Sequence, residues 1–435
     1  MRLGFYEIVS RLNSSYWFVP ALVTLIGAAA AIGLLTVDER VTLDPDSPLA
    51  LLQPRSPEGA RALLSAVIGA MITTISVTFS VTIVALTVAA QHFGPRLLNS
   101  FVRQTSAQMV LGTFLATFAY AVLVLGAIGD DQPRDGVPEL SIVGAVLLVI
   151  VSIGALIYYV HHVSRSLQIG ELARDIAADM RNAIVRRDEE RTGRGRGGTA
   201  PTPPERPRDA AVVCALETGY VQRIDYDTIV ALAARRGARI WMLREPGAFV
   251  VERTWLAFVY PPDASDDELA GTMARAVIVG PDRTLWHDPE FALKQLVEVA
   301  LRALSPAVNE PFTALTCIDR LTEGLAEAAT APEPRAIWHD GTGEPRVYVA
   351  TQSFPTLLRA GFDPIRLFAG VNPAIYARLL ESIADLTPVA IRDADRQALR
   401  HQAEVIRRTA DRELLDTDDR RYVEARYQHA VAGLG

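Results

Sequence analysis

Long uninterrupted runs of apolar residues dominate the first 162 positions of the chain. Four of these runs, at about 17–36, 62–90, 106–128 and 140–160, contain no charged side chain. A helix that crosses the hydrocarbon core of a bilayer needs about 20 apolar residues. Since only helices and closed barrels satisfy the backbone in lipid, the pattern predicts a transmembrane domain of four helices over residues 1–162.

The first apolar run admits a second interpretation as a cleaved signal peptide. Arg2 and Arg11 precede it, and small residues occupy positions 28–31. However, the run is long for a signal peptide, and Tyr16 and Trp17 stand where aromatic anchors meet the membrane surface. These features favour a retained span.

Basic residues are distributed unequally among the segments that connect the spans. The loops after the first and third spans contain more acidic than basic residues. The other segments at the ends of the spans carry a set of arginines: Arg2, Arg11, Arg96, Arg103, Arg165, Arg174, Arg181, Arg186 and Arg187. Short cytoplasmic loops carry the excess of Arg and Lys. The sequence therefore predicts a multi-pass protein of the bacterial inner (plasma) membrane with both termini in the cytoplasm.

The second span is unusually rich in hydroxyl side chains. Thr74, Thr78 and Thr82 recur at intervals of four residues, which places them on one face of a helix. Hydroxyls facing water line some membrane pores. The candidate pore-lining residues are Thr74, Ser76, Thr78, Ser80, Thr82, Thr87 and Gln91. The alternative is close helix packing, for which small and hydroxyl residues are the usual contacts.

Two arginines follow the second span without an acidic neighbour. Arg96 and Arg103 would form a cationic cytosolic mouth if several copies of the span surrounded one axis, and such a ring favours anions. No span carries an ionisable residue at its centre. This argues against a proton-coupled transporter or a voltage sensor, which need charges inside the membrane.

Residues 163–435 have the mixed composition of a soluble α/β domain. We expect a helical extension over 163–190, a disordered Gly-, Arg- and Pro-rich linker over 191–209, a β-rich subdomain over 210–262 and a helix-rich α/β subdomain over 263–435. In the β-rich part, two Gly-led segments, 219–221 and 247–250, flank a short predicted helix. This pattern is similar in shape to barrel-sandwich modules of the biotinyl-lipoyl type and predicts a small β-barrel-like subdomain.

The charge and the cysteines narrow the range of partners. The net charge of −7 gives no reason to expect a nucleic-acid partner. Cys214 and Cys317 lie far apart in the soluble part and form no disulfide framework, which fits a reducing compartment. The lipid bilayer is the partner that the sequence implies directly.

Established catalytic and nucleotide-binding motifs are absent from the sequence, and we expect no metal and no cofactor. The best polar group of residues surrounds two predicted helix starts at Asp288-Pro289 and Glu310-Pro311. It comprises Arg283, His287, Asp288, Arg302, Ser305, Asn309, Glu310 and Asp319. These side chains could form a hydrolytic or ligand site. The alternative is a pair of helix caps and a surface ion-pair set.

Several segments together resemble one bacterial family, a domain of unknown function, family 2254, described as a predicted membrane protein. The similar segments are 79–86, 91–96, 111–114, 118–120, 219–221, 247–250 and 302–314. The last includes the cytosolic motif Arg302, Ser305, Pro306, Asn309, Glu310 and Pro311. Gly94 stands where the family usually has Ser, and Glu310 where it usually has Asp. The resemblance implies an architecture and no established activity.

Three functions are compatible with this pattern. The first is a homo-oligomeric channel or pore-like transport protein for ions or small solutes, with the second span at its axis and the soluble domain as a vestibule. The second is a membrane-anchored sensor or scaffold whose cytosolic domain binds a ligand or partner. The third is a membrane-tethered enzyme, for which no mechanistic motif provides support.

Overall fold

The protein divides into two compact units, residues 1–171 and 172–435, which are described separately. The computed structural model describes residues 17–38, 40, 56–93, 105–128, 138–166, 169–189, 203–285 and 288–434. The remaining positions, which include the predicted linker segment 191–202, Arg96, Arg103 and His287, lie outside the described residues.

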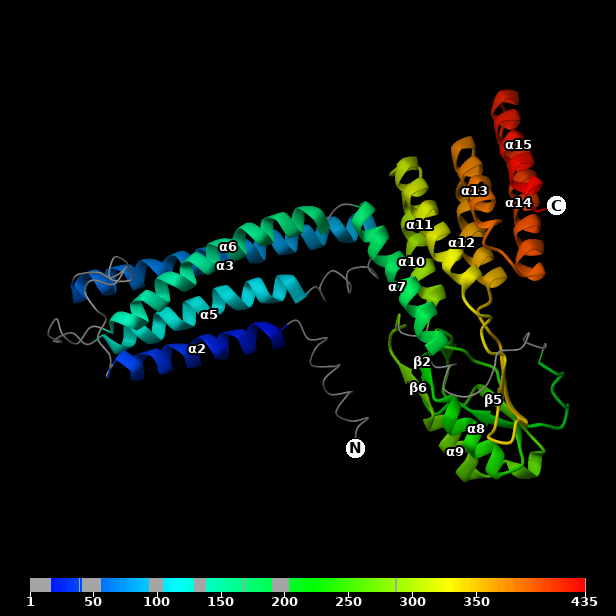
Figure 1. The fold of residues 1–435 in the computed structure, drawn as a ribbon, viewed down its shortest axis with the longest axis horizontal. Coiled ribbons are helices and arrows are strands. Elements are labelled where there is room, and N and C mark those ends of the chain that lie inside the picture. Colours follow the sequence, from blue (N-terminus) through cyan, green and yellow to red (C-terminus); the bar gives the residue numbers. More distant parts are fainter. Residues whose placement is uncertain are drawn as a thin grey trace. The chain divides into compact units, whose positions relative to one another are not determined.

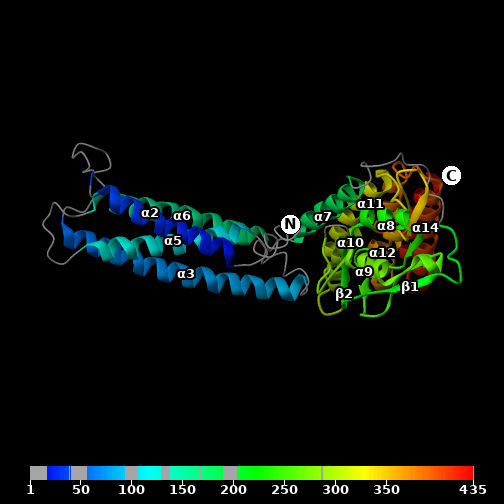
Figure 2. The same ribbon diagram turned by 90° about the horizontal axis from the view of Figure 1, so that it is seen from below.

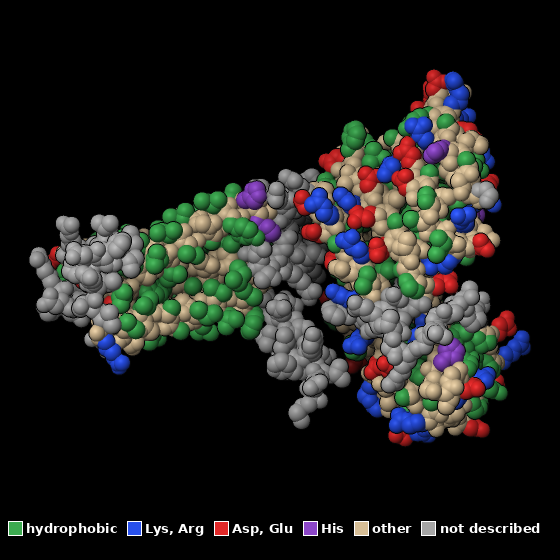
Figure 3. Space-filling view, viewed as in Figure 1, with side chains coloured by type: hydrophobic (Ala, Val, Ile, Leu, Met, Phe, Trp, Pro, Cys, Tyr) green, Lys and Arg blue, Asp and Glu red, His purple; other side chains and the backbone are tan. Residues whose placement is uncertain are grey.

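The described part of unit 1 consists of four long helices that lie side by side (Figure 1, Figure 2). They are α2 (Phe18–Asp38), α3 (Pro57–Phe93), α5 (Thr105–Ala127) and α6 (Glu139–Ser166). All four are long and apolar enough to cross a membrane. Figure 3 shows many apolar side chains on the one face of these helices that it presents. The prediction of four apolar helices is confirmed.

Helix α5 contacts each of the other three helices and forms the centre of unit 1. Its closest approach is to α2, where glycine replaces a side chain on each helix. A Cβ atom at Gly27 would come within 2.7 Å of the Ala116 Cβ atom, and one at Gly112 within 2.9 Å of the Val23 Cβ atom. Without a hydrophobic driving force in lipid, such small-residue contacts are the main way in which spanning helices pack closely.

Unit 2 has a β half and a helical half, and helix α7 (Ile169–Glu189) leads into it (Figure 1). The strands are β1 (Ala211–Cys214), β2 (Gly219–Ile224), β3 (Arg239–Met242), β4 (Phe249–Val250), β5 (Trp255–Tyr260), β6 (Val277–Gly280), β7 (Ile337–His339) and β8 (Pro345–Val349). They form a five-stranded sheet, β1-β5-β3-β8-β7, and a three-stranded antiparallel sheet, β4-β2-β6. Among these described strands, only the β3–β8 pair is parallel.

The two sheets share one hydrophobic core. Val221 of β2 and Val259 of β5 are buried in the same cluster as Leu232 of helix α8 (Tyr226–Arg235) and Met273 of α9 (Asp267–Arg275). The strands described here form two separate sheets, and a closed barrel of the predicted kind is not seen among them. The sequence located strands in this region but did not determine how they pair.

The helical half is a set of six helices that lie against one another (Figure 1). They are α10 (Pro289–Ala303), α11 (Pro311–Thr330), α12 (Phe354–Phe368), α13 (Pro373–Leu386), α14 (Asp393–Glu413) and α15 (Thr417–Ala432). Their buried faces are mainly apolar, and four of them have Pro in the first turn, where the missing N–H has no intrahelical partner.

Helices α11 and α13 run parallel to each other. Arg378 of α13 bonds Asp319 of α11 at 2.6 Å, and one turn further the Thr322 hydroxyl donates to the Ser382 hydroxyl at 2.8 Å. Beyond the C-terminal ends of both helices, Arg392 donates to the Ala331 carbonyl at 2.8 Å. The N-terminal ends of α11 and α13 therefore lie at the same end of the helical half.

Candidate functional sites

The hydroxyl side chains of α3 lie on two different faces of the helix. Thr74 and Thr82 are half-buried, and Thr78 between them is only 4% exposed. The Tyr159 hydroxyl of α6 donates to the Thr78 carbonyl at 3.3 Å and bonds the Thr82 hydroxyl. This half of the predicted pore-lining set packs inside the four-helix unit.

Four other hydroxyl residues of α3, Thr73, Ser76, Ser80 and Thr87, belong to an exposed face, here called the outer stripe. All its members are exposed in unit 1, and their spacing alternates between four and three residues: Ala62, Ala66, Gly69, Thr73, Ser76, Ser80, Ile83 and Thr87. This 3.5-residue average is the spacing of a helix–helix seam. Seven of the eight members are small or carry a hydroxyl, so a second helix could approach the stripe closely.

Three hydroxyl protons of the outer stripe are already bonded within the helix. Thr73 donates to the Gly69 carbonyl at 3.1 Å, and Thr87 donates to the Ile83 carbonyl at 2.8 Å. Ser76 does the same with Ile72 at 2.9 Å. Such bonds make the hydroxyls tolerable in lipid and leave oxygen lone pairs for water, an ion or a neighbouring helix.

The predicted mouth of the pore falls outside the described part of the chain. The helix α3 continues to Phe93, but the side chain of Gln91 is not among those described, and neither is any atom of Arg96 or Arg103. Their assignment to a cytosolic mouth stays a prediction from sequence.

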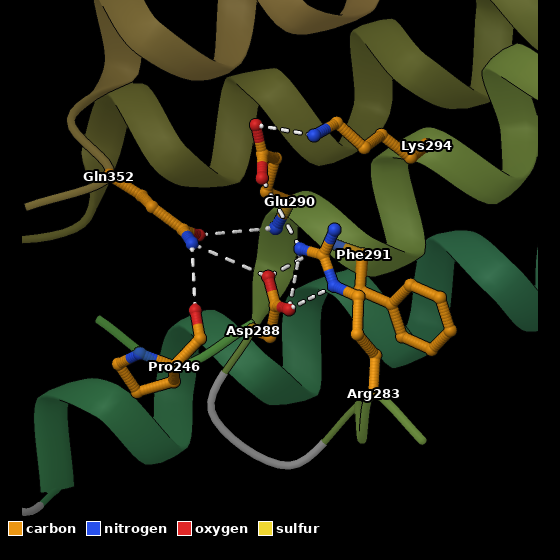
Figure 4. A network of polar contacts seen from close by, with 7 residues as sticks. All are labelled: Pro246, Arg283, Asp288, Glu290, Phe291, Lys294 and Gln352. Atoms are coloured by element: carbon orange, nitrogen blue, oxygen red, sulfur yellow. Dashed lines mark hydrogen bonds and ion pairs between the residues drawn. The ribbon is translucent and has the colours of Figure 1, made fainter. Parts of the chain in front are cut away.

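In unit 2, a polar network surrounds the start of α10, where the β half meets the helical half (Figure 4). The Asp288 side chain caps the helix by accepting from the Phe291 backbone N–H at 3.0 Å. Its other carboxylate oxygen accepts from the Arg283 guanidinium, at 2.9 Å from Nε and 2.6 Å from Nη2. The same guanidinium reaches Glu290 at 3.2 Å.

Gln352, which precedes α12, completes this network from the other side. Its amide oxygen accepts from the Glu290 backbone N–H at 3.3 Å, and its amide nitrogen lies 3.4 Å from both the Pro246 carbonyl and the Asp288 carboxylate (Figure 4). Gly247, which follows Pro246 in the chain, has a φ of +90°. A Cβ atom at this position would lie 2.6 Å from the Arg283 guanidinium. The backbone of the β half thus approaches the network as closely as glycine alone permits.

The buried Asp288 carboxylate lies in a network of oppositely charged side chains. Asp288 is 1% exposed, and this burial raises the pKa of its carboxyl, although the Arg283 guanidinium opposes the shift. Outside it, Lys294 pairs with Glu290 at 3.0 Å. Each charged group has an oppositely charged neighbour, which is the arrangement that makes a buried ion pair tolerable. The network holds two halves of unit 2 together.

The segment from Arg302 to Pro311, predicted as a cytosolic motif, forms the tight turn between α10 and α11. The Ser305 hydroxyl donates to the Arg302 carbonyl at 2.7 Å, and the Asn309 N–H donates to the Ser305 carbonyl at 2.9 Å. Asn309 has a φ of +52°, a conformation that Asn adopts more readily than most residues. Pro306 lies inside the turn, and Pro311 begins α11 directly after Glu310.

The predicted polar residues therefore separate into three places. Arg283 and Asp288 meet in the network, Arg302 to Glu310 form the turn at the other end of α10, and Asp319 pairs with Arg378. Sequence reasoning missed Gln352 and Gly247, which lie far along the chain from Asp288. No group of three or more His, Cys, Asp or Glu residues that could hold a metal ion occurs within the described residues.

Four helices of spanning length, followed by a unit of helices and two small sheets, are the features of a membrane protein. The chain belongs to the family described as "Predicted membrane protein (DUF2254)", which it matches over residues 13–385. It is also similar to uncharacterized proteins of Mycobacterium bovis and Mycobacterium tuberculosis. Each is 31% identical over 425 residues, covering 96% of this chain and 80% of the relative. No solved structure matches the chain.

Proposed function

We propose that the protein is a homo-oligomeric channel or pore-like transport protein in which α3 helices from several copies surround a common axis. The observation that supports this proposal is the outer stripe of α3. It has the spacing of an interhelical seam and consists almost entirely of small and hydroxyl residues, yet it is exposed among the described residues of unit 1. A face that only met lipid would have no need of this composition.

Aligned on an axis, the stripe would offer rings of hydroxyl oxygens to water and ions. The protons of the Thr73, Ser76 and Thr87 hydroxyls are bonded to the helix backbone, so their oxygen lone pairs would point to the passing solute. At the end of α3, Arg96 and Arg103 would supply the cationic cytosolic mouth and a preference for anions. The proposal places both termini in the cytoplasm and the protein in the bacterial inner membrane, as the arginine distribution favours.

Disulfide crosslinking tests the oligomer in the full-length protein, reconstituted in lipid. Cys214 and Cys317 lie outside the four spanning helices and would first be replaced by Ser and Ala. Ser76→Cys or Ser80→Cys should then crosslink copies under mild oxidation. Val81→Cys is the matched control, because Val81 is also exposed but points away from the stripe. Equal crosslinking at all three positions would reject the stripe as the interface.

Conductance in planar bilayers tests the pore separately. Ser80→Asp should shift selectivity toward cations, and charge reversal at Arg96 or Arg103 should weaken the preference for anions. If Ser76→Cys or Ser80→Cys crosslinks and Val81→Cys does not, but no conductance is measured, the protein is an oligomer and not a channel. That outcome would favour the alternative, a membrane-anchored sensor or scaffold, and ligand screening of unit 2 would follow.

A further inference from the structure

One end of the helical half carries exposed apolar side chains that have no role in its core. Phe312, in the first turn of α11, is 82% exposed, and Val308 in the preceding turn is also exposed. The other members, Leu367, Phe368 and Val371, lie at the end of α12 and in the connection to α13. These five residues are here called the apolar end.

Two independent contacts bring these residues to the same end. Because α11 and α13 run parallel, with Arg378 beside Asp319, position 371 is level with position 312. Residues 367 and 368 directly precede the start of α13. The turn at Val308 leads into Phe312 along the chain. The α10–α11 turn lies away from the network at the start of α10, so the apolar end faces away from the sheets (Figure 1).

The same end is the one at which the chain enters unit 2. Figure 1 shows α7 running toward the sheets, as α11 does from its first turn. The side chain of Met180 packs on Gly324, and Arg181 lies 4.0 Å from Glu323. Ile169 lies 11 residues before Met180, and Thr313 lies 11 residues before Gly324. The start of α7 is therefore level with the start of α11.

Covalent connection keeps this end close to the bilayer. The fourth spanning helix is apolar through Val163, and Ile169 follows six residues later. Six residues extend at most about 20 Å. An exposed Phe with aliphatic neighbours is the kind of surface that inserts at the boundary between headgroups and acyl chains. Exposed Leu415 lies outside the proposed surface, because Asp416, Asp418 and Asp419 follow it.

We infer that the apolar end of unit 2, formed by Val308, Leu367, Phe368, Val371 and Phe312, docks on the lipid surface of the membrane that the chain itself spans. Unit 2 then has a membrane-facing end as well as a covalent tether. The segment 302–314, which carries the family resemblance, supplies the most exposed member of this surface. This inference does not depend on channel activity.

A lipid-quenching experiment tests the contact in the full-length protein in nanodiscs. In the background without native cysteines, Phe312→Cys and Val371→Cys would carry an environment-sensitive nitrobenzoxadiazole (NBD) dye. Ile391→Cys is the matched control, because Ile391 is 75% exposed but lies beside Arg392, at the other end of α11. Lipids with a nitroxide near the headgroup should quench the dye at 312 and 371 and leave the dye at 391 bright.

A second variant separates direct insertion from a general position near the membrane. Phe312→Asp, in a protein labelled at 371, should reduce quenching at 371, because the charge opposes insertion of the shared surface. Quenching at 312 and 371 no stronger than at 391 would overturn the inference. A second outcome would also overturn the inference: a dye at 312 or 371 whose emission is blue-shifted but not quenched, with a shift that disappears when each disc holds one copy. That result would show that a second copy of the protein covers the apolar end.

Discussion

The Asp38 carboxylate at the end of α2 accepts hydrogen bonds from both the backbone N–H and the hydroxyl of Ser141 at the start of α6, at 2.9 Å and 2.5 Å. It also accepts from the Leu140 N–H at 2.7 Å. A carboxylate here satisfies N–H groups that the first turn of a helix cannot bond itself, and it interacts favourably with the helix dipole. Two helices that are distant in sequence are thereby joined at one end.

Replacing this cap should destabilise unit 1. We expect Asp38→Ala to lower the free energy of unfolding by about 1–3 kcal/mol, since bonds to a charged acceptor are lost. Thermal unfolding in detergent, followed by circular dichroism, measures the effect. Asp38→Asn retains one acceptor oxygen and should cost less. Equal stability of the Ala variant and the wild type would show that the interaction contributes nothing.

The contact between α2 and α5 can be tested with two glycines of α2, because one of them lies against α5 and the other faces open space. A Cβ atom at Gly27 would meet Ala116, whereas one at Gly33 would have nothing within 4 Å. Gly27→Ala should therefore destabilise the protein by about 1–3 kcal/mol through overpacking. Gly33→Ala should be neutral or slightly stabilising. The contact is refuted if both variants have the same melting temperature in detergent.

The sequence was sufficient for features that depend on local pattern. Apolar runs of spanning length indicated the four apolar helices of unit 1. Asp288-Pro289 correctly marked the start of α10, because capping chemistry acts over three or four residues. The turn at Asn309 likewise follows from adjacent residues.

Pairing between distant segments was not predictable in the same way. The strands of unit 2 were expected to form a barrel-like subdomain, but β3 pairs with β8, more than 100 residues later. The hydroxyl spacing on α3 placed Thr74, Thr78 and Thr82 on one face, but it did not show that this face packs against Tyr159 on α6. Gln352 joins Asp288 only through the tertiary fold.

The two cysteines should differ in reactivity. Cys317 is fully buried in α11, and this burial raises the pKa of its thiol to about 12. Since the thiolate is the reactive form, Cys317 should resist alkylation at neutral pH in the folded protein. Cys214 is half-buried and should react first. Mass spectrometry after brief maleimide treatment measures both. Rapid labelling of Cys317 without denaturant would contradict the packing of α11.

The Arg283–Asp288 pair makes a prediction with a defined pH dependence. Arg283→Met would leave the buried Asp288 carboxylate without its cation, and we expect a loss of about 3–5 kcal/mol at pH 8. The pKa of Asp288 is already raised by burial, and it should rise further without Arg283. Protonation would then favour the folded variant, so its deficit should shrink as the pH falls through that raised pKa. Adding Asp288→Asn removes the charge and should restore part of the stability at pH 8. Chemical denaturation at pH 8 and pH 5 checks this. A deficit independent of pH and unaffected by the second substitution would refute the ion pair as the cause.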